Sequence, residues 1–260
     1  MFSNTELALA FFVAVAGGMI NGIAGGGTVL VFPMLVWLGL GPVEANVTNA
    51  VSLWTASLGG ALGFGEALRR TRRWWFWMSI PAALGGLAGA LLLVLLPAGI
   101  FESSAPFFVL SATLLMLSQP VLRRQLEHLT DGDDEDRIST AVKIAATIAV
   151  FVISIYGGYF GAGLGIFLLV ALGLLGVGNL VRANGLKNVF SFLIKGVAVL
   201  SFAITGNVVW KIALVLMVGS VLGAFVAARL GSRISARALR YSIIGVGFIM
   251  SALMFAGIAG

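Results

Sequence analysis

Eight apolar stretches occupy almost the entire chain, and most of them are about 20 residues long. A helix of about 20 apolar residues spans the hydrocarbon core of a bilayer, which is about 30 Å thick. Of the 260 residues, 60% are hydrophobic and only 10% are charged, which is too little charge to cover a water-soluble domain of this length. The pattern predicts an all-α integral membrane protein with many crossings. The stretches cover residues 7–40, 45–66, 74–96, 104–122, 144–181, 183–203, 207–228 and 239–258.

Two stretches, 7–40 and 144–181, are too long for a single crossing, because straight helices of that size would extend roughly 50 Å. Each contains a glycine cluster near its middle, "NGIAGGG" starting at Asn21 and "YGGYFGAGLG" starting at Tyr156. Glycine weakens a helix, and irregular backbone at membrane depth is tolerated only where it is buried in protein or lines a polar cavity. We expect each stretch to break and fold back at its glycines.

Basic loops predict the orientation of the chain. Lys- and Arg-rich loops tend to lie in the cytoplasm, and three segments qualify: 69–73, 123–143 and 228–240. The +6 net charge gathers in these segments beside apolar stretches, so it reads as an orientation signal and not as a nucleic-acid surface. Counting crossings between the loops places both termini outside and gives the two halves of the chain opposite orientations.

A weak internal repeat agrees with inverted halves. "GLGPVEAN", ending at Asn46, matches "GVGNLVRAN", ending at Asn184, with one insertion. Glu44 falls outside in the first copy and Arg182 falls inside in the second, the sign change expected of inverted copies. The sequence therefore predicts a polytopic helical bundle of two inverted-topology repeats, each with a glycine-broken helix. The predicted boundaries are 1–122 for the first membrane repeat, 123–143 for a charged cytoplasmic linker and 144–260 for the second membrane repeat.

The broken helices and the helices after them predict an anion site. The free N–H groups at the start of a half-helix carry partial positive charge and suit an anion near the middle of the bilayer. The helix after each break also carries polar residues at steps of three and four, which form one stripe. The candidate substrate-binding residues are Asn21, Gly25, Gly26, Gly27, Thr28, Asn46, Thr48, Asn49 and Ser52 in the first half, and Gly161, Gly163, Gly165, Asn184, Lys187, Asn188, Ser191 and Lys195 in the second.

Lys195 is the most informative of these residues, since it lies roughly 20 Å along its helix from the expected cytoplasmic entry. Inserting a lysine at such depth costs about 2.5–3.5 kcal/mol, so its ammonium should face a cavity or a partner. Acidic partners are scarce, because only Glu44 and Glu66 lie in or beside apolar segments. A transported anion would balance the charge, with Lys187 and Arg182 as further candidates. The alternative is a structural clamp, in which Lys195 bonds to carbonyls at a helix end.

The residues from Gly22 to Ser52, "GIAGGGTVLVFPMLVWLGLGPVEANVTNAVS", resemble the TauE/SafE family of membrane permeases, the sulfite and organosulfonate exporters. The second copy from Gly161 to Ser191 is similar to the weaker repeat of that family, and the resemblance extends over essentially the whole chain. The second copy lacks a proline after its glycines, so we expect its helix break to be softer. The resemblance implies transport of sulfite, sulfonates or similar sulfur-containing anions across a bacterial inner membrane.

We therefore expect a secondary transporter that works by alternating access, with no cofactor and no bound metal. An anion channel and a non-transporting assembly protein stay open as alternatives. A membrane enzyme is disfavoured, because cysteine is absent and the only histidine, His128, lies in a charged loop. The acidic loop 131–136 lacks the glycine and terminal glutamate of a calcium-binding EF-hand. The expected partners are a small anion and the lipid bilayer, with a homodimer and a coupling ion (proton or sodium) undecided.

Overall fold

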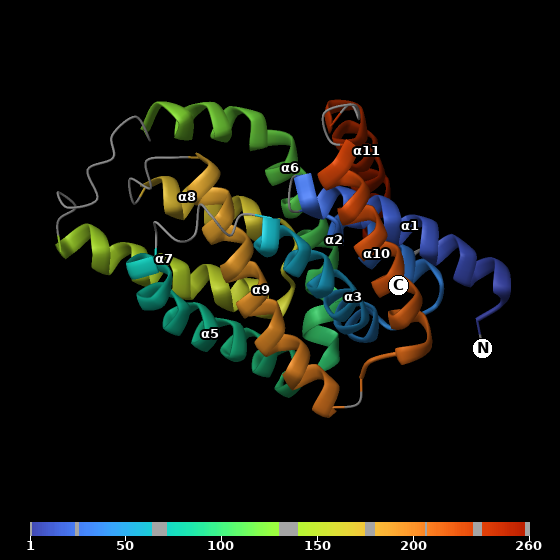
Figure 1. Ribbon diagram of the computed structural model, residues 1–260. Coiled ribbons are helices and arrows are strands. Elements are labelled where there is room, and N and C mark those ends of the chain that lie inside the picture. Colours follow the sequence, from blue (N-terminus) through green and yellow to red (C-terminus); the bar gives the residue numbers. More distant parts are fainter. Residues whose placement is uncertain are drawn as a thin grey trace.

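The computed structural model describes residues 2–23, 26–63, 72–129, 140–174, 180–205, 207–230 and 236–257. Within these ranges the chain is helical and contains no strand (Figure 1). The helices are α1 (Asn4–Ile23), α2 (Thr28–Trp37), α3 (Pro42–Gly63), α5 (Arg72–Leu95), α6 (Ala98–Leu129), α7 (Thr140–Tyr159), α8 (Leu164–Leu174), α9 (Leu180–Thr205), α10 (Trp210–Leu230) and α11 (Ala236–Phe255).

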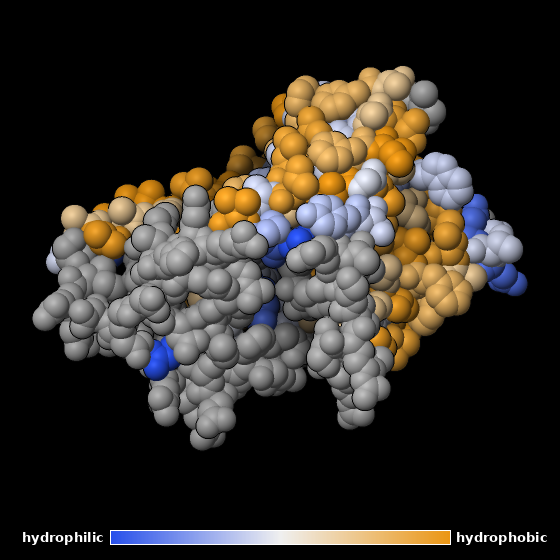
Figure 2. All heavy atoms as spheres, turned by 90° about the horizontal axis from the view of Figure 1, so that it is seen from above, coloured by the Kyte–Doolittle hydropathy of each residue, from blue (hydrophilic) through white to orange (hydrophobic). Residues whose placement is uncertain are grey.

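The predicted all-α membrane fold is confirmed. Six of the described helices, α1, α5, α6, α7, α9 and α10, are long and apolar enough to cross a bilayer. In the view of Figure 2, hydrophobic residues, coloured orange, cover much of the described surface. Ile204 is 86% exposed and Phe12 69% exposed, for example. Such a surface is unfavourable in water and suits contact with lipid.

Both over-long stretches break at their glycines, as predicted. The first divides between Ile23 and Thr28 and the second between Tyr159 and Leu164. In each case a helix of 20 residues is followed by a short one, α2 with 10 residues and α8 with 11. A helix of that length rises about 15–16 Å, roughly half of the hydrocarbon core.

The second break forms at its glycines without a proline, and the expectation that it is softer than the first stays a prediction. Gly161 and Gly163 adopt φ angles of +76° and +72°, a left-handed conformation that ends the helix and that only glycine adopts without strain. The hydroxyl of Tyr156 donates a hydrogen bond to the carbonyl oxygen of Ala162 at 2.7 Å and ties this turn back to α7. The first copy places its proline, Pro33, inside α2 and not at the break.

Three helices of the second half follow their counterparts in the first half at one interval. The helices α9, α10 and α11 begin at residues 180, 210 and 236, each 138 positions after the starts of α3, α5 and α6 at residues 42, 72 and 98. The packing repeats as well: α1 packs on α10 while α7 packs on α5, and α3 contacts α10 while α9 contacts α5. The helices α3 and α9 contact each other, as do α6 and α11.

This exchange of partners is the pattern produced by a two-fold relation, in which equivalent surfaces meet. Figure 1 shows the result, with α5 from the first half beside α7 and α10 from the second half near α1. The packing is consistent with two repeats in which one helix of each repeat, α5 or α10, packs against helices of the other repeat. Their opposite orientation in the membrane stays a prediction.

Equivalent residues meet where α3 crosses α9. Trp54 stacks on Phe192, 138 positions later, with ring centroids 5.2 Å apart and an interplanar angle of 17°. The indole Nε1–H of Trp54 also donates to the carbonyl oxygen of Phe192 at 3.1 Å. Since the two rings occupy equivalent positions, this contact lies close to the local two-fold axis.

The glycine pairs at positions 59/63, 85/89 and 219/223 have the four-residue spacing that predicts close helix packing, and the structure confirms such packing for two of them. A Cβ atom added at Gly85 or Gly89 would fall on backbone atoms of α7, and one added at Gly219 or Gly223 would fall on backbone atoms of α1. Gly85 and Gly223 are 138 positions apart, so a glycine allows close helix contact at the equivalent position of each half. The third pair, Gly59 and Gly63, lies outside the part of the chain whose side chains are described.

Candidate functional site

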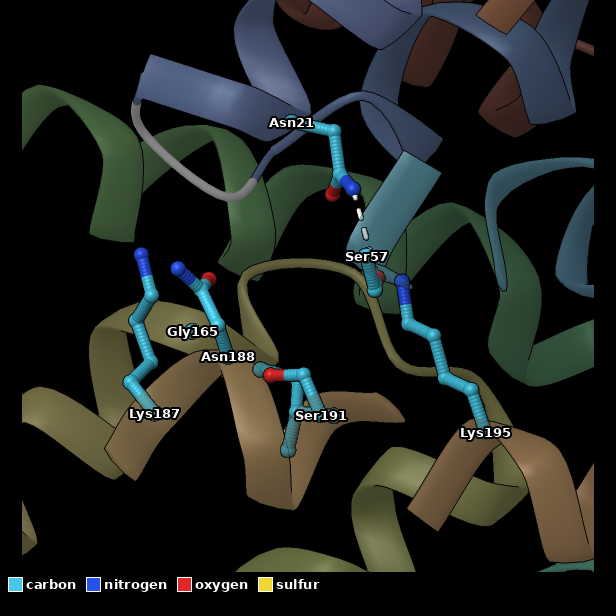
Figure 3. Close-up of a pocket in the computed structure, with 8 residues that line it drawn as sticks. Asn21, Ser57, Gly165, Lys187, Asn188, Ser191 and Lys195 are labelled. Carbon is cyan, nitrogen blue, oxygen red and sulfur yellow. Dashed lines mark hydrogen bonds between the residues drawn. The ribbon is translucent and has the colours of Figure 1, made fainter. Parts of the chain in front are cut away.

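A small polar pocket lies where α1 and α3 of the first half meet α8 and α9 of the second (Figure 3). Six of the predicted site residues line it, together with two that were not predicted. The lining consists of Asn21, Ser57, Leu164, Gly165, Lys187, Asn188, Ser191 and Lys195.

The two lysines dominate the electrostatics of this pocket. Lys187 is 3% exposed and Lys195 7% exposed, and both extend from α9 toward the first half of the chain (Figure 3). Within the part of the chain that the structure describes, neither ammonium forms a hydrogen bond or an ion pair. The geometry therefore does not support the structural clamp, in which Lys195 would bond to helix carbonyls.

Among the residues that the structure describes, no carboxylate lines the pocket. The acidic side chains that the structure describes are Glu6, Glu44 and Glu102, and none of them belongs to the lining. Uncompensated buried charge is costly, and no described carboxylate offsets these two ammonium groups.

Neutral groups complete the lining. Between the two lysines, Asn188 and Ser191 present an amide and a hydroxyl toward the pocket (Figure 3). From the first half, the amide nitrogen of Asn21 donates to the hydroxyl of Ser57 at 3.5 Å, a long bond. Leu164 and Gly165 begin α8, so the positive end of this short helix lies at the pocket. The set combines fixed positive charge with short polar side chains, which suits a small oxyanion.

The polar stripe of α3 lies mostly outside the pocket and ties helices together. The amide of Asn46 donates to the carbonyl oxygen of Tyr159 at 2.8 Å. The hydroxyl of Thr48 accepts from the backbone N–H of Val209 at 3.2 Å. The carbonyl oxygen of Ser52 accepts from the hydroxyl of Ser220 at 2.7 Å. These bonds connect α3 with α7 and with the start and middle of α10.

The remaining predicted residues also lie away from the lining. Gly26, Gly27 and Thr28 are buried, and a Cβ atom at Gly27 would fall on the carbonyl group of Gly17. Gly161 and Gly163 form the turn before α8. Asn49 is buried in α3 and does not border the pocket. Gly25 and the side chain of Asn184 lie outside the described residues.

Ser57 is the polar pocket residue that sequence reasoning missed. Figure 3 shows the Lys195 side chain ending beside it. A signal was present in the sequence, because Ser57 lies 138 positions before Lys195, the same interval that separates Asn46 from Asn184 in the repeat. Extending that alignment along the two helices would have paired Ser57 with Lys195.

Comparison with known proteins agrees with this architecture. The model of the sulfite exporter TauE/SafE family matches residues 10–254. The chain belongs to this family. A probable membrane transporter protein of Haemophilus influenzae is 31% identical over 253 residues, covering 95% of this chain and 94% of the relative. The probable membrane transporter protein YfcA of Escherichia coli K12 is 29% identical over 256 residues, covering 97% and 90%.

A more distant relative, the probable membrane transporter protein ORF9 of Sinorhizobium, is 24% identical over 250 residues and covers 96% of this chain and 92% of its own. No solved structure gives a significant match. Family membership and the six apolar helices together identify the chain as a multi-pass membrane transporter.

Proposed function

We propose that this TauE/SafE family member is a secondary carrier that moves a small sulfur-containing anion, such as sulfite or an organosulfonate, across the bacterial inner membrane. One observation carries the proposal: two buried lysines share a polar pocket with no carboxylate and no protein counter-charge among the described residues. A bound oxyanion supplies that charge. The name of the family gives the sulfur chemistry of the proposed substrate.

Each group of the pocket has a role in this proposal. Lys195 and Lys187 balance the charge of the anion, while Asn188, Ser191 and Ser57 orient its oxygen atoms by hydrogen bonds. The pocket lies between helices of both halves, so a relative movement of the halves would expose it first to one side of the membrane and then to the other. Alternating access is therefore the proposed mechanism.

The test is counterflow into proteoliposomes, with sulfite, taurine, sulfoacetate, thiosulfate, sulfate and acetate as the panel. A carrier exchanges labelled for unlabelled anion in a saturable way, whereas an anion channel allows leak without exchange. Saturable exchange of one sulfur anion supports the proposal. Leak alone would support a channel, and a protein inert toward all six anions would remove the proposed substrate class.

The role of Lys195 in charge balance is tested by a substitution and a matched control. A charged hydrogen bond contributes about 1.5–3 kcal/mol, so Lys195→Gln should weaken the apparent affinity for the anion by about 10- to 150-fold. Lys211→Gln, at an exposed lysine at the start of α10, is the control and should transport normally. Normal affinity in the Lys195 variant, with the protein correctly folded, would contradict the charge-balancing role.

A further inference from the structure

Two buried oxygen atoms of α3 have no hydrogen-bond partner among the residues that the structure describes. They are the side-chain carbonyl oxygens of Asn46 and Asn49, and each residue is only 1% exposed. The residues are three positions apart and therefore share one face of the helix. A buried polar atom without a partner costs about 1–3 kcal/mol, so two of them on one helix face point to a missing ligand.

The orientation of the Asn46 amide follows from its own hydrogen bond. Its nitrogen donates to the carbonyl oxygen of Tyr159, and a carbonyl oxygen can only accept. The other atom of the amide is therefore the oxygen, and what it lacks is a donor or a cation. Tyr159 is the last residue of α7, so the bond also places Asn46 at the carbonyl end of that helix, which carries partial negative charge.

The internal repeat gives a second, independent reason to look for a positive charge here. Asn49 lies 138 positions before Lys187, the interval that relates α3 to α9. One half of the protein thus carries a lysine side chain where the other half carries an amide oxygen without a described partner. A mobile cation bound in the first half would restore the equivalence of the two positions.

We propose that Asn46 and Asn49 bind a small monovalent metal cation, with Na⁺ as the probe, and that this cation is the coupling ion of the transporter. Neutral oxygen ligands and carbonyl groups at helix ends are the ligands that hold Na⁺ in transporters built from repeats. The role as coupling ion rests on the proposed anion transport, whereas cation binding does not. An ordered water molecule would also satisfy these oxygens, and the experiment separates the two occupants.

The first measurement is thermal unfolding of the purified full-length protein in detergent, without anion substrate, in Na⁺, Li⁺, K⁺ or choline chloride at equal ionic strength. An ion that binds only the folded state stabilises it by RT ln(1 + [ion]/Kd), so a cation site predicts an unfolding temperature that rises with the logarithm of the cation concentration above its Kd. The rise should be larger in one of the metal ions than in choline. Equal unfolding temperatures in all four salts would overturn the proposal and favour water.

Two variants test the site itself. Asn49→Ala should weaken the apparent affinity for the cation at least tenfold, and Asn188→Ala, at a buried amide in the lysine pocket, should retain the cation response. Asn49→Lys supplies a fixed ammonium, as in the second half, and should make unfolding and counterflow independent of Na⁺. A full cation response in folded Asn49→Ala would overturn the assignment.

The two proposals fail separately. Selective stabilisation by a metal ion without any anion counterflow would keep the cation site and remove the proposed transport. Saturable anion counterflow that is equally fast in Na⁺ and choline, from a protein that shows no selective stabilisation, would keep the transport and remove the cation site.

Discussion

Because α1 and α10 pack in close contact, we predict that replacing glycine by alanine has opposite effects on the free energy of unfolding at two positions, Gly223 in α10 and Gly245 in α11. At Gly223 an added Cβ atom would fall on the carbonyl oxygen of Val15, close to the backbone nitrogen of Met19. At Gly245 in α11 an added Cβ atom would meet no other atom within 4 Å. Both glycines lie inside helices, so the difference isolates the effect of packing.

The expected magnitudes follow from these surroundings. Overpacking a close contact costs about 1–3 kcal/mol, so Gly223→Ala should lower the free energy of unfolding by about that amount. Gly245→Ala should raise it by up to about 0.5–1 kcal/mol, because alanine restricts the unfolded chain and favours the helix. At about 2–4 °C per kcal/mol, the unfolding temperatures of the two variants should differ by several degrees.

The assay is thermal unfolding in detergent, followed by the fluorescence of the six tryptophans. Gly85→Ala serves as a third variant, since an added Cβ atom there would fall on the carbonyl oxygen of Phe151 in α7. It should destabilise the protein about as much as Gly223→Ala does. If Gly223→Ala and Gly245→Ala shifted the unfolding temperature by the same amount and in the same direction, the reasoning from close helix contact would be refuted.

Two further substitutions test the central helix crossing and the second break. Trp54→Phe keeps the stacking on Phe192 but removes the Nε1–H bond, so it should lower the free energy of unfolding by about 0.5–1.5 kcal/mol; an unchanged unfolding temperature would show that the bond contributes nothing. Tyr156→Phe removes the bond to Ala162 that ties the turn before α8, and it should slow counterflow, whereas Tyr241→Phe, at an exposed ring, should not. Equal rates in these two tyrosine variants would show that the tie does not affect the pocket.

The candidate site could be predicted only in part. The four residues that α9 contributes to the pocket follow from the spacing of polar residues on a single helix. The polar stripe of α3 looks similar in sequence, yet the hydroxyl of Thr48 accepts from the backbone just before α10 and the hydroxyl of Ser52 donates to the carbonyl oxygen of Asn49 within α3. A stripe shows which face of a helix is polar, and it does not show which helix packs against that face.

The sequence by itself determined the helical membrane fold, the positions of both helix breaks and the depth of Lys195 in an apolar segment. These are local properties, since they depend on the length of an apolar run, on glycine and on helical periodicity. The tertiary structure alone decided that α5 and α10 change partners between the halves and that Thr48 meets the segment before α10 and not the lysine pocket. Such contacts depend on how surfaces far apart in the chain fit together, and no single segment contains that information.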